Sequence, residues 1–151
     1  MKKRRLQKIA SIFTSVIFLF IIDRILKYWA QYGLYHAKID IIKNWLTFEL
    51  FKNQQIAFSI PLPQIIIIPL IIIIITILIA LFIQRIKVYW GLMEIGLLFM
   101  IAGAVSNVYD RLQHGFVIDY LNFYFLPVFN IADVMVGIGV IMIIISMFRK
   151  K

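Results

Sequence analysis

The stretch IIIIPLIIIIITILIALFI, residues 65–83, decides the class of fold. Isoleucine is β-branched and favours strands in water-soluble proteins. A strand, however, crosses a bilayer in about ten residues and leaves its edges unpaired in lipid, where unpaired backbone groups are costly. The length of the stretch therefore overrides its β propensity and predicts a membrane-spanning helix. Pro69 falls in the first turns, where a missing backbone N–H matters little.

The rest of the chain has the same character. Hydrophobic residues make up 63% of the 151 residues, and the mean hydropathy is +0.95. This composition is typical of a membrane protein. We therefore predict a single all-α membrane domain, residues 1–151, with four transmembrane helices at about residues 9–30, 64–84, 90–110 and 131–148, and outer segments at residues 31–63 and 111–130.

The basic residues predict the orientation of these helices. The formal net charge of +9 would suggest a nucleic-acid partner in a soluble protein, but here the positive charges lie at the ends of apolar stretches. They precede the first stretch, separate the second from the third and follow the fourth, at residues 2–5, Lys8, Arg85, Lys87 and 149–151. The positive-inside rule then places both termini in the cytoplasm and gives no role to nucleic acid.

The first outer segment contains NWLTFELFKN, in which Phe48 and Leu50 alternate with Thr47 and Glu49. Alternation with a period of two predicts a strand with one wetter face. We expect a small extracytoplasmic flap containing β structure, lying over whatever the helices enclose.

The polar residues of the outer half carry the functional prediction. There is no cysteine, which excludes disulfides, thiolate metal sites and a cysteine nucleophile. The predicted orientation brings carboxylates and amides from distant parts of the chain to one depth. An ionised residue inside a bilayer costs about 2.5–3.5 kcal/mol, so such residues usually face the bundle interior and mark function. The residues at this depth are Asp23, Asn53, Asn107, Asp110, Asp119, Asn130 and Asp133.

Each acid also has a structural interpretation. Asp133 suits the N-terminal end of a helix, and Asp119 suits an ordinary loop. Asp23 with Lys27 has the i, i+4 spacing of a helical ion pair. Asp110 lies next to Arg111, and we interpret these two as an ion pair at a helix end.

Other nucleophiles and bases are poorly placed. His36 and His114 fall on different outer loops without companions, so we expect neither to hold a metal or to act as a base. Ser106 and His114 are separated by a helix end and a loop, which argues against a serine nucleophile activated by histidine.

Five short motifs resemble, in order and spacing, those of the bacterial lipoprotein signal peptidases, signal peptidase II. The motifs are DRILK (23–27), NQQIAF (53–58), GAVSNVYDR (103–111), VIDY (117–120) and FNIAD (129–133), and the resemblance, which includes length and four spans, covers essentially the whole chain. The resemblance implies an aspartic endopeptidase of the bacterial cytoplasmic membrane that removes signal peptides from prolipoproteins. It implies cleavage before a cysteine carrying diacylglycerol, with no cofactor, and we expect a monomer surrounded by membrane lipid.

The resemblance also assigns roles to residues. It implies that Asp119 and Asp133 are the catalytic pair, and that Asp23 with Lys27 is structural. The residues implied to support the pair or bind substrate are Asn53, Asn107, Asp110, Arg111 and Asn130. The family often has glycine where this chain has Gln55 and Ser106. The first departure affects the backbone of the flap, and the second affects helix packing near Asn107.

Chemistry agrees with a carboxyl pair. Two carboxylates about 3 Å apart cannot both stay ionised, so they share a proton and titrate together. The ionised member can activate water while the protonated member polarises the scissile carbonyl, and the sequence does not assign the proton to either.

Two other functions use the same residues. A small proton- or cation-coupled transporter subunit would use the outer acids as an ion path, although in the second to fourth apolar stretches only Glu94 continues that path inward. A non-catalytic assembly factor would use the cluster to bind a partner. Replacement of Asp119 or Asp133 by Asn separates these alternatives from a peptidase, and an ion-flux assay in liposomes tests the transporter.

Overall fold

The computed structural model describes residues 2–33, 38–55, 63–88 and 90–149 of the chain. Four long helices account for most of these residues: α1 (Lys2–Tyr28), α2 (Gln64–Ile86), α3 (Leu92–His114) and α4 (Ile131–Phe148). One turn of π-helix, Trp29–Gly33, extends α1. Each of the four is long and apolar enough to cross a bilayer. The predicted four-helix membrane fold is confirmed.

Helix α2 contains the isoleucine-rich stretch and is helical despite its β-branched residues, as predicted. Ile67 and Ile75 are buried, whereas Ile65 is 81% exposed, and Ile66, Ile73 and Ile77 are also exposed. So much exposed apolar surface would be unfavourable in water, but it suits contact with lipid chains.

A small antiparallel sheet completes the fold, with strand order β1 (Lys38–Ile42), β2 (Leu46–Asn53) and β3 (Val117–Phe123). Strand β2 contains the alternating segment in which a strand was predicted, and it places Phe51 opposite Asp119 and Asn53 opposite Val117. The predicted β-containing flap is confirmed. The register between β2 and β3 shifts between Phe48 and Phe51.

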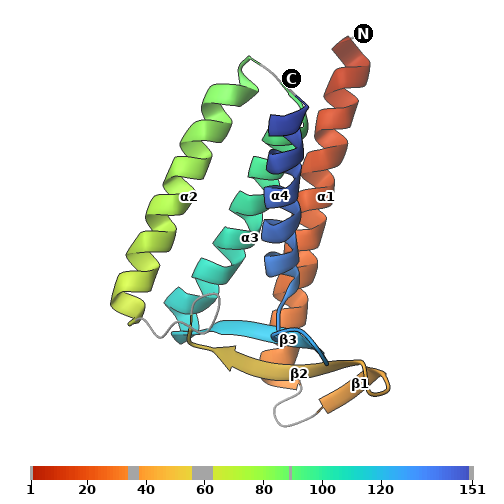
Figure 1. The fold of residues 1–151 in the computed structure, drawn as a ribbon, viewed down its shortest axis with the longest axis vertical. Helices are drawn as coiled ribbons and strands as arrows, with labels where there is room; N and C mark the ends of the chain where they lie inside the picture. The colour runs from red at the N-terminus through yellow and green to blue at the C-terminus, as the bar shows by residue number, and fades with distance from the viewer. Residues whose placement is uncertain (1, 34–37, 56–62, 89, 150–151) are drawn as a thin grey trace.

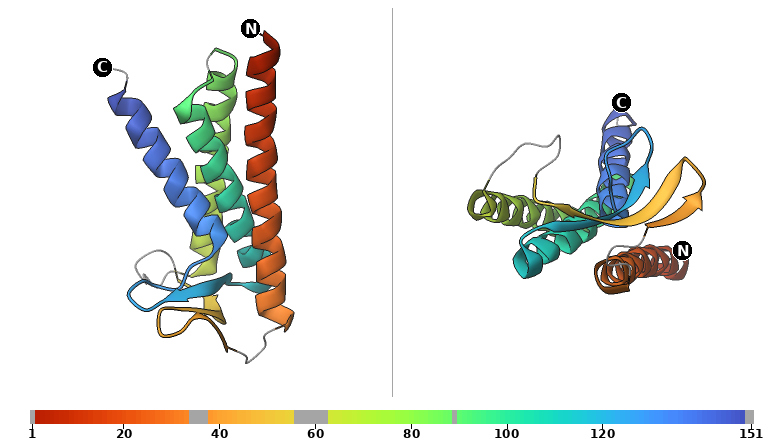
Figure 2. Two further views of the ribbon diagram at one scale, coloured as in Figure 1. Left: turned by 90° about the vertical axis from the view of Figure 1, so that its right-hand side faces the viewer. Right: turned by 90° about the horizontal axis from the view of Figure 1, so that it is seen from below.

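The sheet lies across one end of the helices, and both chain termini lie at the other end (Figure 1). Viewed from below, β2 and β3 cross the ends of the helices (Figure 2). Residues from the π-helical turn, β2 and β3 form a hydrophobic core at this end of the molecule, which fixes the sheet to α1: Ala30, Phe48, Ile118 and Tyr120. Polar side chains on β2 and β3 are thereby brought to the ends of α1, α3 and α4.

Two differences from the sequence prediction lie near these polar side chains. Helix α3 continues past residue 110 to His114, and Gly115 ends it in the left-handed conformation with a φ of 75°. Glycine adopts this conformation without steric cost, which is why the helix stops there. Arg111 is consequently a helical residue, and Asp119 lies on a strand where a loop was expected.

Helices α3 and α4 pack closely. A Cβ on Gly96 would lie 2.7 Å from the carbonyl oxygen of Gly139, and a Cβ on Gly103 would lie 2.4 Å from that of Ala132. Small residues of this kind let helix backbones approach in membranes. The close approach sets the positions of Asn107 on α3 and Asp133 on α4.

Candidate active site

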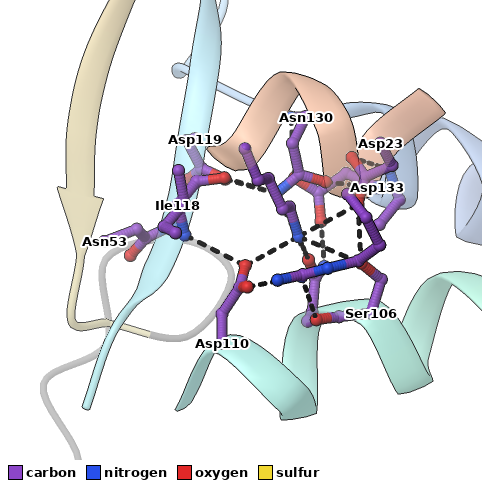
Figure 3. Close-up of polar contacts among 12 residues, drawn as sticks. Asp23, Asn53, Ser106, Asp110, Ile118, Asp119, Asn130 and Asp133 are labelled. Atoms are coloured by element: carbon purple, nitrogen blue, oxygen red, sulfur yellow. Dashed lines mark hydrogen bonds and ion pairs between the residues drawn. The ribbon is translucent and has the colours of Figure 1, made fainter. Parts of the chain in front are cut away.

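A buried polar cluster lies where the sheet meets the ends of α1, α3 and α4 (Figure 3). All seven acids and amides predicted to share one depth contribute to it, together with Lys27, Ser106 and Arg111. Most of them are hidden from solvent, including Asp23, Asp110, Asp119 and Asn130, whose exposed fractions are 1% or less. Such burial requires hydrogen bonds or ion pairs for every charge.

Asp119 lies on β3 and accepts two side-chain hydrogen bonds. The donors are Asn53 Nδ2 at 2.8 Å and Asn130 Nδ2 at 2.6 Å. Burial and the nearby charge of Asp133 raise the pKa of Asp119 to about 7, while the hydrogen bonds oppose this rise. A carboxyl group with this pKa exchanges a proton readily near neutral pH.

Asp133 lies in the first turn of α4 and also accepts two hydrogen bonds. Asn107 Nδ2 donates to Asp133 Oδ1 at 2.7 Å, and the backbone N–H of Asn130 donates to Asp133 Oδ2 at 3.2 Å. The backbone N–H of Asp133 donates to Asn130 Oδ1 at 2.9 Å, which completes a capping box. The favourable position at the helix N-terminus predicted for Asp133 is therefore present.

Asn130 joins the two carboxylates. Its side-chain amide donates to Asp119, and its side-chain carbonyl and backbone N–H form the capping box with Asp133. Asp119 and Asp133, fourteen residues apart in the sequence, are thus held by one residue, through its side chain and its backbone N–H respectively, within electrostatic reach of each other.

A layer of ion pairs surrounds this pair of acids. Lys27 Nζ lies 3.2 Å from Asp23 Oδ2, so the predicted i, i+4 ion pair is present. The predicted pairing of Asp110 with Arg111 is wrong. Asp110 instead pairs with Arg24 at 2.5 Å and with Lys27 at 2.8 Å, because neighbouring helical residues point in directions about 100° apart.

Arg111 connects the cluster to the ends of the segment between β2 and α2. It donates to the backbone carbonyl of Gln55 at 2.7 Å and to Gln64 Oε1 at 3.3 Å. Gln55 stands where the family often has glycine, and its N–H donates to Asn53 Oδ1 at 3.0 Å. The remaining residues of the NQQIAF motif, 56–58, lie outside the described residues, as does His36.

Ser106, the second departure from the family pattern, takes part in the ion-pair layer. It is fully buried, and its hydroxyl donates to Asp23 Oδ2 at 2.6 Å. His114 stacks on Phe116 with ring centroids 5.8 Å apart. The two residues therefore have different partners, in agreement with the prediction that they do not form a nucleophile and base.

Sequence reasoning missed Tyr120. Its hydroxyl donates to Asp23 Oδ1 at 2.9 Å and accepts from the backbone N–H of Ile131 at 3.1 Å. Burial, followed by the charge of Asp23, raises the pKa of this phenol, so it stays neutral. The sequence offered only its position next to Asp119, because the strand that contains both residues was not predicted.

Comparison with known proteins places this chain in a family. The Signal peptidase (SPase) II family profile matches residues 15–149. The lipoprotein signal peptidase of Clostridium novyi (strain NT) is 35% identical over 141 residues, covering 89% of this chain and 95% of that protein. That of Clostridium tetani (strain Massachusetts / E88) is 31% identical over 136 residues, covering 86% of this chain and 87% of that protein.

The fold is also similar to solved structures. One, described as a bacterial membrane enzyme, superposes with a TM-score of 0.84 at 28% identity and covers 93% of this chain and 89% of that chain. A second bacterial membrane enzyme gives a TM-score of 0.82 at 28% identity and covers 95% of this chain and 96% of that chain.

Proposed function

This chain belongs to the signal peptidase II family, and from that premise we propose that Asp119 and Asp133 are its catalytic pair. The protein is a multi-pass membrane peptidase of the aspartic type, and it removes signal peptides from prolipoproteins. The observation that supports this assignment of the pair is the link through Asn130, which holds a strand acid and a helix acid together in one buried cluster.

The proposed mechanism needs one proton on the pair. The ionised carboxylate takes a proton from a water molecule, which attacks the scissile carbonyl carbon. The protonated carboxyl donates a hydrogen bond to the carbonyl oxygen, and a proton then passes to the leaving amine. The raised pKa of Asp119, at about 7, favours a singly protonated pair near neutral pH.

Three amides support this chemistry by donating to the pair. Asn53 and Asn130 donate to Asp119, and Asn107 donates to Asp133. These bonds occupy one oxygen or more of each carboxylate and fix its direction. Asp110 and Arg111 act one layer further out, where Arg111 also holds the carbonyl of Gln55 beside the site.

The location of the cluster suits a lipid-modified substrate. It lies at the sheet end of four apolar helices, which we assign to the extracytoplasmic face of the bacterial cytoplasmic membrane. A signal-peptide helix can then approach sideways from lipid, and the acyl chains of a diacylglyceryl cysteine can stay in the bilayer. Selectivity comes from fit around this cysteine, since acyl chains gain nothing by leaving lipid for protein. We propose that the enzyme works as a monomer.

The test is cleavage of a diacylglyceryl-modified precursor by purified wild type, Asp119→Asn and Asp133→Asn. Asn keeps the shape but cannot share the proton, so both variants should lose at least about 10³-fold in rate, since both acid and base assistance are lost. Asp40→Asn is the matched control, because Asp40 is an exposed carboxyl on β1 away from the cluster. Normal cleavage by Asp119→Asn or Asp133→Asn would show that the residue replaced in that variant is not catalytic.

A second comparison tests the lipid requirement. The wild-type enzyme should cleave the lipid-modified precursor much faster than an unmodified precursor of the same sequence. Equal rates would contradict the proposed recognition of the modified cysteine and would leave the catalytic pair unaffected.

A further inference from the structure

Lys27 is a fully buried cation at the centre of the ion-pair layer. Its ammonium lies 3.2 Å from Asp23 Oδ2 and 2.8 Å from Asp110 Oδ2. It also donates to Asn107 Oδ1 at 2.7 Å and to Ser106 Oγ at 3.4 Å. A buried ammonium is costly unless it is paired, so its position between two carboxylates accounts for its stability there. The contact with Asn107 instead orients the amide of Asn107.

The contact with Lys27 determines which way the Asn107 amide faces. An ammonium group donates hydrogen bonds and accepts none, so the oxygen of Asn107 must point toward Lys27. The amide nitrogen is then left to donate to Asp133 Oδ1. Asn130 Nδ2 also donates to Asn107 Oδ1, at the longer distance of 3.3 Å. Without the shorter bond from Lys27, the amide could turn more easily and present its oxygen to Asp133, which would repel an ionised carboxylate.

Lys27 also affects the charge of the cluster. Among the described residues, four buried or half-buried carboxylates meet three cations here: Asp23, Asp110, Asp119 and Asp133 with Arg24, Lys27 and Arg111. If all seven were ionised, one negative charge would be left over. A single proton on the Asp119–Asp133 pair makes the cluster neutral, which is the state that dyad catalysis requires. Without Lys27, the cluster would need a second proton, on the Asp119–Asp133 pair, to be neutral.

The other polar groups around the pair do not change this balance. On β3, the phenol of Tyr120 is neutral and donates to Asp23. On β2, Asn53 is neutral and donates to Asp119. On the same strand, Lys52 is exposed and its ammonium lies over the ring of Phe116.

We propose that Lys27 is a positioning residue of this peptidase, which turns the Asn107 amide toward Asp133 and supplies the charge that leaves the Asp119–Asp133 pair with one proton. This inference rests on the proposed catalytic pair. It extends the site to Lys27, which acts on the pair through Asn107 and through its charge. Independent support comes from electrostatics, since burial and Asp133 raise the pKa of Asp119 and the charge of Lys27 lowers it.

The test is the pH dependence of the cleavage rate for four variants. Lys27→Met removes a positive charge, so the pair should bind its second proton more readily, and the acidic limb of the profile should move up by about one pH unit. Asp110→Asn removes a negative charge, so the acidic limb should move down by a similar amount. Lys27→Arg keeps the charge, so the limb should stay at the wild-type pH.

The double variant Lys27→Met/Asp110→Asn separates the two roles. Its net charge equals that of the wild type, so its acidic limb should return to within about half a pH unit of the wild-type position. Its maximal rate should stay reduced by about tenfold or more, because the amide of Asn107 is no longer held and a hydrogen bond to a charged group is lost. A merely structural lysine would lower rates in these variants without moving the limbs in opposite directions.

The experiment still decides if one variant fails to fold or if the proposed function is wrong. If Lys27→Met does not fold in detergent, Asp110→Asn and the charge-balanced double variant still decide, and unshifted or equally shifted limbs would overturn the inference. Failure of the proposed function looks different: Asp119→Asn or Asp133→Asn would then cleave normally. If Asp119→Asn and Asp133→Asn are inactive but the acidic limbs of the Lys27 and Asp110 variants do not move, only the role of Lys27 is refuted.

Discussion

Asn130 and Asp133 cap each other at the start of α4, with Asp133 N donating to Asn130 Oδ1 at 2.9 Å and Asn130 N donating to Asp133 Oδ2 at 3.2 Å. A motif that usually begins a helix here also orients a proposed catalytic carboxylate. The same Asn130 side chain reaches Asp119. The start of α4 and the positioning of the proposed catalytic pair therefore both depend on Asn130. Substitutions at this residue can separate the two effects.

Asn130→Ser and Asn130→Ala make that separation. Serine keeps an oxygen that can cap α4 but loses the amide that donates to Asp119, whereas alanine loses both. The serine variant should be more stable than the alanine variant by about 1 kcal/mol, the usual value of an N-cap. Both should lose activity by about tenfold or more, because a bond to a charged acceptor is missing. Thermal unfolding and cleavage rates measure the two effects, and a fully active serine variant would contradict the role assigned to the amide.

The raised pKa of Asp119 predicts how stability depends on pH. In the unfolded chain Asp119 loses its proton near pH 3.8, whereas in the folded protein it keeps it up to about pH 7. The folded state therefore binds more protons in this window, and the contribution of Asp119 to stability falls as pH rises from about 4 to 7, by at most about 1.4 kcal/mol per unit.

Asp119→Asn should remove this slope. We expect the melting temperature of the variant to equal or exceed that of the wild type at pH 7.5, with the difference shrinking or reversing at pH 5. Melting curves of wild type, Asp119→Asn and the exposed control Asp40→Asn across this range make the comparison. A wild-type slope in the Asp119→Asn variant would show that another group is responsible.

The hydroxyl of Ser106 should matter for stability rather than for protonation. Ser106→Ala removes a bond of 2.6 Å to a buried carboxylate, which typically costs about 1.5–3 kcal/mol. Ser106→Gly, which introduces the residue that the resemblance leads us to expect here, should cost about 1 kcal/mol more through helix propensity. Neither change alters a charge, so the acidic limb of the pH–rate profile should not move.

The control for this series is Ser15→Ala. Ser15 is exposed on α1, and its hydroxyl bonds to the carbonyl of Ser11 within the same helix. Its loss should leave the melting temperature nearly unchanged. Equal melting temperatures for Ser106→Ala and Ser15→Ala would mean that the bond to Asp23 contributes nothing.

The sequence was sufficient where the cause is local or set by the solvent. The length of the isoleucine-rich stretch predicts α2, and the i, i+4 spacing predicts the pair of Asp23 with Lys27. Resemblance supplied Asp119 and Asp133. The sequence could not supply the partner of Asp110, because Arg24 lies 86 residues away on another helix.

Strand β3 was not predicted, because it too depends on residues far away in the sequence. It forms because β2 and the core around Phe48 give it hydrogen-bond partners and a surface to pack on, and neither is encoded within residues 117–123 alone. The close contact of α3 with α4 was equally hidden, since a glycine in an apolar stretch does not reveal which helix it faces.

Glycine substitutions test that contact directly. Gly96→Ala would place a Cβ 2.7 Å from the carbonyl of Gly139, and Gly139→Ala would place one 2.6 Å from the carbonyl of Gly96. Backbone cannot yield as a flexible side chain would, so each variant should lose about 1–3 kcal/mol of stability. Because the helices also carry Asn107 and Asp133, separation should weaken the 2.7 Å bond between these residues and lower the cleavage rate.

Gly137→Ala is the matched control on the same helix. A Cβ at Gly137 would meet nothing within 4 Å, so alanine there should raise stability by up to about 1 kcal/mol through helix propensity. Opposite signs for Gly139→Ala and Gly137→Ala, two residues apart on α4, would assign the loss to the contact with α3 rather than to the helix itself. If both variants gained stability, the α3–α4 contact would have to be looser than the 2.6 Å approach requires.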